Sequence, residues 1–289
     1  MHKINATFGS AGMGEAFASS GGKSSLQFPG FLKNYGLDTF EYQCGRGVNI
    51  SSEKARQLGE QAALHGMVLS LHAPYYISLS SIEEQKRLNS INYILQSARA
   101  VSDMGGHRVV LHSGSCGKLQ RNEALELAKD TLRQAIDALN AEGLSHIRLC
   151  PETMGKLNQL GDLAEVLELC SLDERMIPCV DFGHLNARTQ GGLKSLADFA
   201  AVFELMENSL GLSRLREFHC HFSKIEYTKG GEKQHLTFED TLFGPEFEPV
   251  AELTLKKQCS PVFICESRGT QERDALAMKE IYGNLKKIF

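Results

Sequence analysis

Six successive apolar segments of this sequence end in a histidine, an aspartate or a glutamate. The residues are His72, His112, Glu152, Asp181 together with His184, His219 and Glu266. A single imidazole or carboxylate in such a position is usually a hydrogen-bonded or solvated residue. Burying all of them on one rim is different, because each unpaired charge costs several kcal/mol unless cations compensate it. The pattern therefore predicts a metal site.

The donor types restrict the metal. Imidazole nitrogen and carboxylate oxygen, without an obvious thiolate, suit zinc, manganese or iron, and zinc is the usual choice for imidazole-rich sites. One such ion takes about four ligands, water included, so these candidates predict a cluster of roughly two to three Zn²⁺ ions, with Mn²⁺ or Fe²⁺ as the other metals that fit. The eight cysteines are scattered singly, without a C-x-x-C pair, and we expect them to be reduced and buried. Ligation of zinc by a thiolate is the alternative.

The apolar segments are typical of buried strands, and eight of them follow one another along the chain. They are expected at residues 4–8, 38–42, 67–72, 108–112, 146–152, 177–184, 216–221 and 261–266. Helical patterns alternate with them, and the second begins at Ser51 or Ser52 as its N-cap. These helices are expected near residues 26–35, 51–66, 81–105, 122–143, 160–170, 195–210 and 272–289.

Eight strand–helix units without a break in composition predict an α/β fold, a single (β/α)₈ TIM barrel over residues 1–289. An open sheet is less consistent with the sequence, because no glycine-rich G-x-G-x-x-G turn or topological switch is evident. Barrel enzymes keep their chemistry at the C-terminal ends of the strands, which is where the polar residues fall. We therefore expect the metal site at that face.

Composition excludes several classes of protein. The hydrophobic content of 42% and charged content of 23% are ordinary for a globular protein, and no apolar run approaches the roughly 20 residues that span a bilayer. The amino terminus lacks the apolar region of a signal peptide, so we expect a cytoplasmic protein without a membrane partner. The net charge of −4 argues against a generally basic nucleic-acid surface. Bound metal could still make one site locally positive.

Short motifs on the predicted rim resemble those of a known family. They are Leu71-His72-Ala73-Pro74-Tyr75, His112-Ser113-Gly114-Ser115, Pro151-Glu152-Thr153, Asp181-Phe182-Gly183-His184, Phe218-His219 with Ser223-Lys224, and Cys265-Glu266. The chain resembles, over nearly its whole length, the endonuclease IV family of zinc-dependent apurinic/apyrimidinic DNA-repair endonucleases. That family lies within the wider xylose-isomerase-like TIM-barrel superfamily.

The resemblance implies a division of the ligands among three ions. Glu152 would bridge two of them and would be the central catalytic residue. His72 and His112 would complete the first ion, and Asp181, His219 and Glu266 would complete the second. The third ion would take His184 with an aspartate and a histidine from the loop after the seventh strand. There the sequence departs from the family spacing and reads Gly231-Glu232-Lys233-Gln234-His235, so Glu232 and His235 are the candidates and His221 is a spare imidazole nearby.

The resemblance also implies a partner and a reaction. A monomer would bind double-stranded DNA and hydrolyse the phosphodiester bond 5′ to an abasic site with the help of the metals. Tyr75, Tyr76 and Arg46 would insert into the DNA, which costs least where a base is already missing. In the other interpretation the two tyrosines line a pocket and Arg46 is a surface charge.

Two other functions are compatible with parts of the pattern. A sugar isomerase or epimerase of the same superfamily keeps a single metal, for which Glu152, Asp181, His219 and Glu266 would be the ligands, and its two glutamates transfer the proton. His72, His112 and His184 have no role in such an enzyme, which favours the nuclease. A non-catalytic metal-binding protein would leave the open coordination of the rim unexplained.

Overall fold

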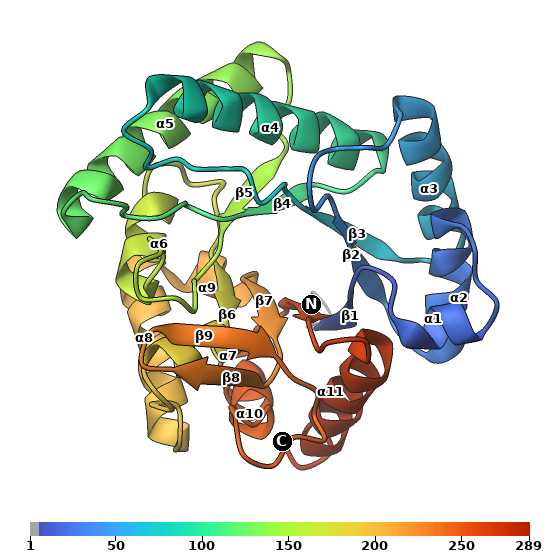
Figure 1. Ribbon diagram of the computed structural model, residues 1–289. Coiled ribbons are helices and arrows are strands. Elements are labelled where there is room, and N and C mark those ends of the chain that lie inside the picture. The colour runs from blue at the N-terminus through green and yellow to red at the C-terminus, as the bar shows by residue number, and fades with distance from the viewer. Residues whose placement is uncertain (1–5) are drawn as a thin grey trace.

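The computed structural model describes residues 6–289 and has eight parallel strands in one sheet, in the order β5-β4-β3-β2-β1-β10-β7-β6 (Figure 1). The strands are β1 (Thr7–Ala11), β2 (Thr39–Gln43), β3 (Val68–His72), β4 (Arg108–Leu111), β5 (Arg148–Pro151), β6 (Cys179–Asp181), β7 (His219–Phe222) and β10 (Val262–Cys265). Each contains part of a segment predicted as a strand. Ile4 and Asn5, the predicted start of the first strand, lie outside the described residues.

The two ends of the sheet meet between β5 and β6, a place that we call the seam. Glu152, directly after β5, forms an isolated parallel bridge with Cys179 of β6. The Thr153 N–H donates to the Cys179 carbonyl oxygen at 3.0 Å. These contacts bring the sheet nearly to closure, and the predicted (β/α)₈ barrel is confirmed.

Helices surround the barrel (Figure 1). They are α1 (Glu15–Ser19), α2 (Phe28–Tyr35), α3 (Ser52–Leu64), α4 (Glu84–Asp103), α5 (Arg121–Ala141), α6 (Leu163–Cys170), α7 (Phe182–Arg188), α8 (Leu196–Leu210), α9 (Leu212–Arg216), α10 (Glu248–Lys256) and α11 (Gln271–Leu285). Ser51 is the N-cap of α3, as the sequence suggested, and its hydroxyl accepts the Lys54 N–H at 3.3 Å. Within residues 6–289, no helix combines the length and the apolar character needed to cross a bilayer.

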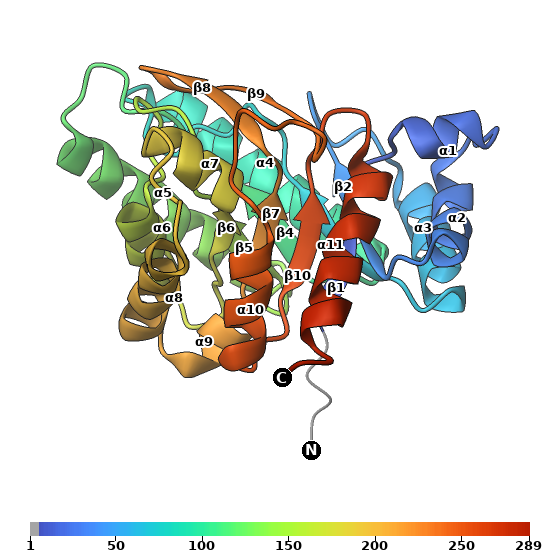
Figure 2. The same cartoon turned by 90° about the horizontal axis from the view of Figure 1, so that it is seen from below.

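Two features of the C-terminal face differ from the sequence-based expectation. The sixth strand ends at Asp181, because α7 begins at the next residue and carries His184. The segment after β7 is an antiparallel hairpin of β8 (Ile225–Thr228) and β9 (Gly231–His235), where the sequence suggested a loop. In side view this hairpin lies across the C-terminal face of the barrel (Figure 2).

The inside of the barrel is more polar than is usual for this architecture. Valine, isoleucine and leucine normally fill a TIM barrel. Here Glu41, Ser70 and His219 are at most 1% exposed. Glu41 of β2 lies 3.1 Å from His219 of β7 although β1 and β10 stand between these strands, so the contact crosses the barrel interior.

A cluster of four phenylalanine rings packs on the outer side of the sheet. The Phe263 ring on β10 lies 5.1 Å from the Phe8 ring, 5.1 Å from the Phe247 ring and 6.3 Å from the Phe218 ring, measured between centroids. All four side chains are at most 1% exposed. Each aromatic pair of this kind adds about 0.5–1.5 kcal/mol to the free energy of burial. The cluster therefore stabilises the packing of β7 and β10, whose C-terminal ends lie at the C-terminal face.

Truncating the central ring of this cluster should destabilise the fold. We expect Phe263→Ala to lower the free energy of unfolding by about 3–5 kcal/mol, because it removes buried area and leaves a cavity. Urea unfolding followed by circular dichroism measures the change. Leu242→Ala is the control, since the Leu242 side chain is 82% exposed and its loss should cost no more than about 0.5 kcal/mol. Equal effects of the two substitutions would contradict the role given to the cluster.

Candidate metal centre

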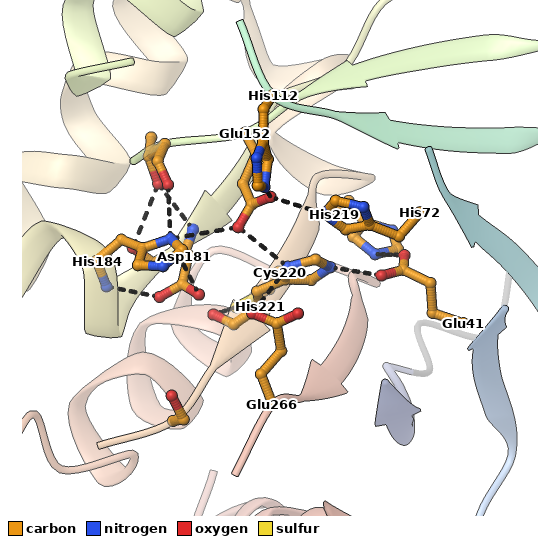
Figure 3. Close-up of polar contacts among 12 residues, drawn as sticks. Glu41, His72, His112, Glu152, Asp181, His184, His219, Cys220, His221 and Glu266 are labelled. Atoms are coloured by element: carbon orange, nitrogen blue, oxygen red, sulfur yellow. Dashed lines mark hydrogen bonds and ion pairs between the residues drawn. The ribbon is translucent and has the colours of Figure 1, made fainter. Parts of the chain in front are cut away.

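Side chains from six strands or their C-terminal ends, and from α7, converge at the C-terminal face (Figure 3). Side chains of the β8–β9 hairpin join them. Donor atoms of the described residues form four groups that could each hold a metal ion. The first three are His72, His112 and Glu152; Glu152, Asp181, His221 and Glu266; and His184, Glu232 and His235. The fourth, which consists of Cys179, His219 and His221, is fully buried. Glu152 belongs to two of the groups, as a bridging ligand would.

The first group joins β3 and β4 to the end of β5. The Nε2 atoms of His72 and His112 lie 3.2 Å and 3.1 Å from the same Glu152 oxygen. His72 Nδ1 lies 2.8 Å from the Ala73 carbonyl oxygen, which can only accept, so Nδ1 carries the proton. The lone pair of His72 Nε2 is therefore left to bind a cation.

The second group lies on the other side of Glu152. His221 Nδ1 is 3.2 Å from the second Glu152 oxygen and 3.5 Å from a Glu266 oxygen. Asp181 is fully buried, and its Oδ2 atom has no hydrogen-bond partner. A buried carboxylate oxygen without a partner is costly. This group as a whole, three carboxylates and one imidazole, fits a divalent cation such as Zn²⁺ or Mn²⁺.

The structure brings His221, and not His219, to this second group. Side chains two residues apart on a strand face the same side, so both imidazoles point into the barrel. His219 lies one layer deeper, fully buried, with its Nε2 atom 3.1 Å from Glu41. The structure places His219 in the separate buried group with Cys179 and His221, and His221 is the histidine of this strand in the second group. The ligand role of His219 stays a prediction, and His221 becomes a further candidate.

The third group depends on α7 and on the β8–β9 hairpin. The Asp181 carboxylate accepts the His184 backbone N–H at 2.7 Å, and His184 Nδ1 lies 2.9 Å from the Thr153 carbonyl oxygen. His184 Nε2 is thereby turned toward Glu232, at 3.4 Å. His235 Nε2 lies 3.9 Å from the other Glu232 oxygen. The unusual spacing of Glu232 and His235 is thus compatible with a common site.

The hairpin is held in this position by backbone and side-chain contacts. The Glu232 N–H donates to the Gly155 carbonyl oxygen at 3.1 Å. Ser223 Oγ lies 2.8 Å from His235 Nδ1, which leaves Nε2 facing the site. A register shift between Glu226 and Tyr227 interrupts the hairpin ladder. These contacts orient both candidate ligands of β9 toward α7.

Buried charges of both signs shift the pKa values of the centre. Burial by itself would raise the pKa of Glu152, but the charge of His221 and hydrogen bonds from other imidazoles hold it well below its usual value. Burial would lower the pKa of His184, but the charges of Asp181 and Glu152 raise it well above the usual range. Burial also raises the pKa of Asp181 to about 6. His184 thus holds a proton that metal binding would release.

The donors open into a cavity of about 400 Å³, which Lys156 also lines. A second cavity of about 480 Å³ adjoins it and includes Lys233 and Arg268. The residues that line both are Tyr75, Glu232, His235 and Glu266. The two cavities therefore form one groove over the donor groups, with cationic side chains in both parts. We refer to it as the groove.

Of Tyr75, Tyr76 and Arg46, Tyr75 lines the groove. The two tyrosines are 59% and 53% exposed, and the Tyr75 ring is 5.7 Å from the His112 ring. The Tyr75 N–H donates to the Gly45 carbonyl oxygen at 3.0 Å, which places the exposed Arg46 turn beside the tyrosine. The turn that carries Arg46 is therefore bonded to the backbone of Tyr75, and the contact of Tyr75, Tyr76 and Arg46 with DNA stays a prediction.

Residues 30–287 match the family described as xylose isomerase-like TIM barrel. The chain belongs to this family. A relative in Methanocaldococcus jannaschii, an uncharacterized protein, is 33% identical over 254 residues, which cover 88% of this chain and 90% of the relative. A probable endonuclease 4 of Acholeplasma laidlawii is 27% identical over 179 residues, which cover 60% of this chain and only 59% of that protein.

The solved structures that are similar to this one include an endonuclease and an epimerase-like protein. Endonuclease IV from Thermus thermophilus superimposes with a TM-score of 0.65 at 18% identity, covering 98% of this chain and 100% of that chain. A D-tagatose 3-epimerase-like protein also gives 0.65, at 21% identity, covering 87% and 89%. These structural matches concern the fold. Together with the relatives named endonuclease 4 and the family match, they confirm the resemblance predicted from the motifs.

Two residues near the centre were not predicted from the sequence, because neither is a polar residue at the end of a strand. Glu41 lies within β2, between aromatic residues, and contacts both His219 and His221. A carboxylate between two aromatic residues of a strand was the available signal. Gly155 lies where α7 and the hairpin meet, and a Cβ atom there would be 2.6 Å from Glu232 Cβ and 2.9 Å from His184 Cδ2. Only the tertiary contact identifies this glycine.

A methyl group at Gly155 should disturb the third group selectively. We expect Gly155→Ala to push Glu232 away from His184 and to reduce the metal content by about one ion per chain, because the ion would lose its geometry. Inductively coupled plasma mass spectrometry of the purified protein measures this loss. Circular dichroism should show a folded protein.

Gly230→Ala is the matched control in the same hairpin. Its Cβ atom would meet only Thr228 Oγ1 within 4 Å, at 3.8 Å. We expect this variant to keep the metal content of the original chain. If Gly155→Ala and Gly230→Ala held equal amounts of metal, the third group would not be a metal site.

Proposed function

We propose that the protein is a metal-dependent endonuclease that hydrolyses the phosphodiester bond 5′ to abasic sites in double-stranded DNA. The observation that carries this proposal is the third donor group. His184, Glu232 and His235 lie beside two groups that already share Glu152. Such a surplus of donors suits a cluster of ions, and clusters of this kind serve phosphodiester hydrolysis. Similarity to proteins named probable endonuclease 4 supports the same class.

Zn²⁺ is the cofactor that we infer from the donors, and Mn²⁺ or Fe²⁺ would also fit them. The three ions would be held by His72, His112 and Glu152; by Glu152, Asp181, His221 and Glu266; and by His184, Glu232 and His235. When bound, the ions would supply Lewis-acid polarisation of the phosphoryl group and activation of water. Three divalent cations exceed the charge of the four carboxylates by about two, which favours an anionic substrate.

The side chains around the groove would orient the DNA. Tyr75 stands beside His112, so an inserted ring would bring the lesion next to the donors. Arg46 is exposed on the turn whose backbone binds Tyr75 and would contact the DNA backbone or the gap left by the missing base. Insertion costs a few kcal/mol for a stacked base step and least at an abasic site. Lys156 and Arg268 line the groove and would bind phosphates.

A single-metal sugar epimerase is the second candidate. The four donors Glu152, Asp181, His221 and Glu266 alone would hold one ion. An epimerase-like protein is also among the structural neighbours. This alternative leaves His72, His112 and the whole third group without a task, and we therefore rank it second.

Glu152 provides the central test of the proposed activity. We expect metal-loaded protein to cleave a duplex that holds one abasic site, on the 5′ side of the lesion. Glu152→Ala should lower the incision rate by more than about 100-fold, the loss that even an outer-shell partner of a metal ligand can cause. The variant should also lose bound metal, because it lacks the shared ligand. Denaturing gels and metal analysis measure both effects.

The result that would overturn the endonuclease is specific. It is failure of the metal-loaded protein to incise the abasic duplex, combined with turnover of a ketose or an aldose. A metal content of one ion per chain would also support the epimerase.

Tyr75 and Arg46 provide a test of the DNA contacts. We expect Tyr75→Ala and Arg46→Ala each to weaken binding to the abasic duplex, and the loss of a stacking ring should cost about 1–3 kcal/mol. Fluorescence anisotropy with metal-loaded protein measures the affinity. Arg99→Ala is the control, because Arg99 is a cation on α4 that pairs with Glu142 away from the groove. Unchanged affinity of both groove variants would remove these residues from the DNA interface.

A further inference from the structure

Glu41 is a buried carboxylate to which the proposed function assigns no task. It lies on β2 inside the barrel and is fully buried. Ser70 Oγ donates to its Oε2 atom at 2.9 Å, and Gln43 Nε2 donates to its Oε1 atom at 3.1 Å. A buried carboxylate of this kind is costly without further partners. Its remaining contacts therefore indicate what it does.

Two imidazoles of β7 provide these contacts (Figure 3). Glu41 Oε1 lies 3.0 Å from His221 Nε2, and Oε2 lies 3.1 Å from His219 Nε2. The opposite nitrogen of His221, Nδ1, lies 3.2 Å from Glu152. His221 therefore stands between Glu41 and the donor groups, with one ring nitrogen facing each.

This arrangement matches a general requirement of metal-binding histidines. An imidazole that binds an ion through one nitrogen carries its proton on the other, and a carboxylate that accepts this proton fixes the ring and strengthens the ligand. The His221 N–H is not yet aligned with Glu41, since His221 Nε2 has no hydrogen-bond partner in the structure. The separation of 3.0 Å between His221 Nε2 and Glu41 Oε1 is within hydrogen-bonding distance.

We propose that Glu41 is a positioning residue for the metal centre. It holds His221 with the Nε2 proton toward the carboxylate of Glu41 and with Nδ1 toward Glu152, where His221 and Glu152 would both hold an ion. The other carboxylate oxygen faces His219 and Ser70, on the side away from His221. The inference rests on the metal centre of the proposed function, but it is independent of the substrate.

The test is the affinity for metal of Glu41→Gln. The amide keeps the size of the side chain, removes its charge and can donate to His221 Nε2, which would place the imidazole proton on Nδ1 instead. Metal-stripped protein is titrated with Zn²⁺ in competition with a chromophoric chelator. We expect one of the bound ions to be held about 10–100-fold more weakly, as for other outer-shell carboxylates. The other ions should keep their affinities.

Ser70→Ala is the matched control. It removes a hydrogen bond from the same carboxylate, but at the oxygen that faces His219, and leaves the contact with His221. We expect its Zn²⁺ affinities to stay within about threefold of the original values. An equal loss in the two variants would mean that the pocket is merely structural, and it would overturn the proposal.

A thermal unfolding experiment separates the two roles of Glu41 even if Glu41→Gln is less stable than the unsubstituted protein. Metal that binds only the folded state raises the unfolding temperature in proportion to the logarithm of its affinity. A positioning role predicts a smaller Zn²⁺-induced rise in Glu41→Gln than in the original chain. If Glu41 is only structural, metal-stripped Glu41→Gln should unfold at a lower temperature, and Zn²⁺ should raise that temperature as much as in the unsubstituted protein. This result would refute the proposal.

Two further outcomes separate this inference from its alternatives. Original affinities for every ion in Glu41→Gln would overturn it. A further Zn²⁺ ion that the unsubstituted protein binds and Glu41→Gln does not bind would also overturn it. Glu41 would then be a metal ligand itself, beside His219 and Cys179. Absence of DNA incision by the original chain, together with the expected loss of affinity in Glu41→Gln, would refute the endonuclease alone.

Discussion

The sharing of one buried carboxylate among several imidazoles is the constraint on which the site depends. Glu152 is 1% exposed and contacts His72, His112, His184 and His221. These partners come from β3, from the ends of β4 and β7, and from α7, so the carboxylate holds together segments that are far apart in the sequence. A carboxylate with this environment stays ionised only because positive charge surrounds it. Protons on the imidazoles or metal ions must supply that charge.

Much of the fold was predictable, because local rules determine it. Apolar segments alternate with helical patterns along the whole chain, and a parallel barrel is the fold that buries eight such strands. Most of the donors were predictable for the same reason, since His72, Glu152 and Glu266 fall at strand ends. Conversely, the end of β6 was missed, because Asp181 is both a strand residue and the cap of α7.

Other parts of the site depend on tertiary packing that a sequence does not reveal. His219 and His221 face the same side of β7, and only the relative heights of neighbouring strands decide which one reaches Glu152. Glu232 and His235 meet His184 because an irregular hairpin lies on the face of the barrel. Glu41 acts across the barrel, from a strand that is not a neighbour of β7. Long-range geometry, and not residue type, selects these partners.

The seam between β5 and β6 has a mechanical meaning. Backbone pairing there consists of an isolated bridge and few hydrogen bonds, whereas β2 and β3 are in register over five residue pairs. Glu152 stands on one side of the seam and Asp181 on the other, and both belong to the same donor group. An ion bound by both would act as a cross-link over the weakest joint of the barrel. Metal binding would then join the two ends of the sheet and complete the reactive site at the same time. The barrel would become rigid in the same step in which the site becomes active.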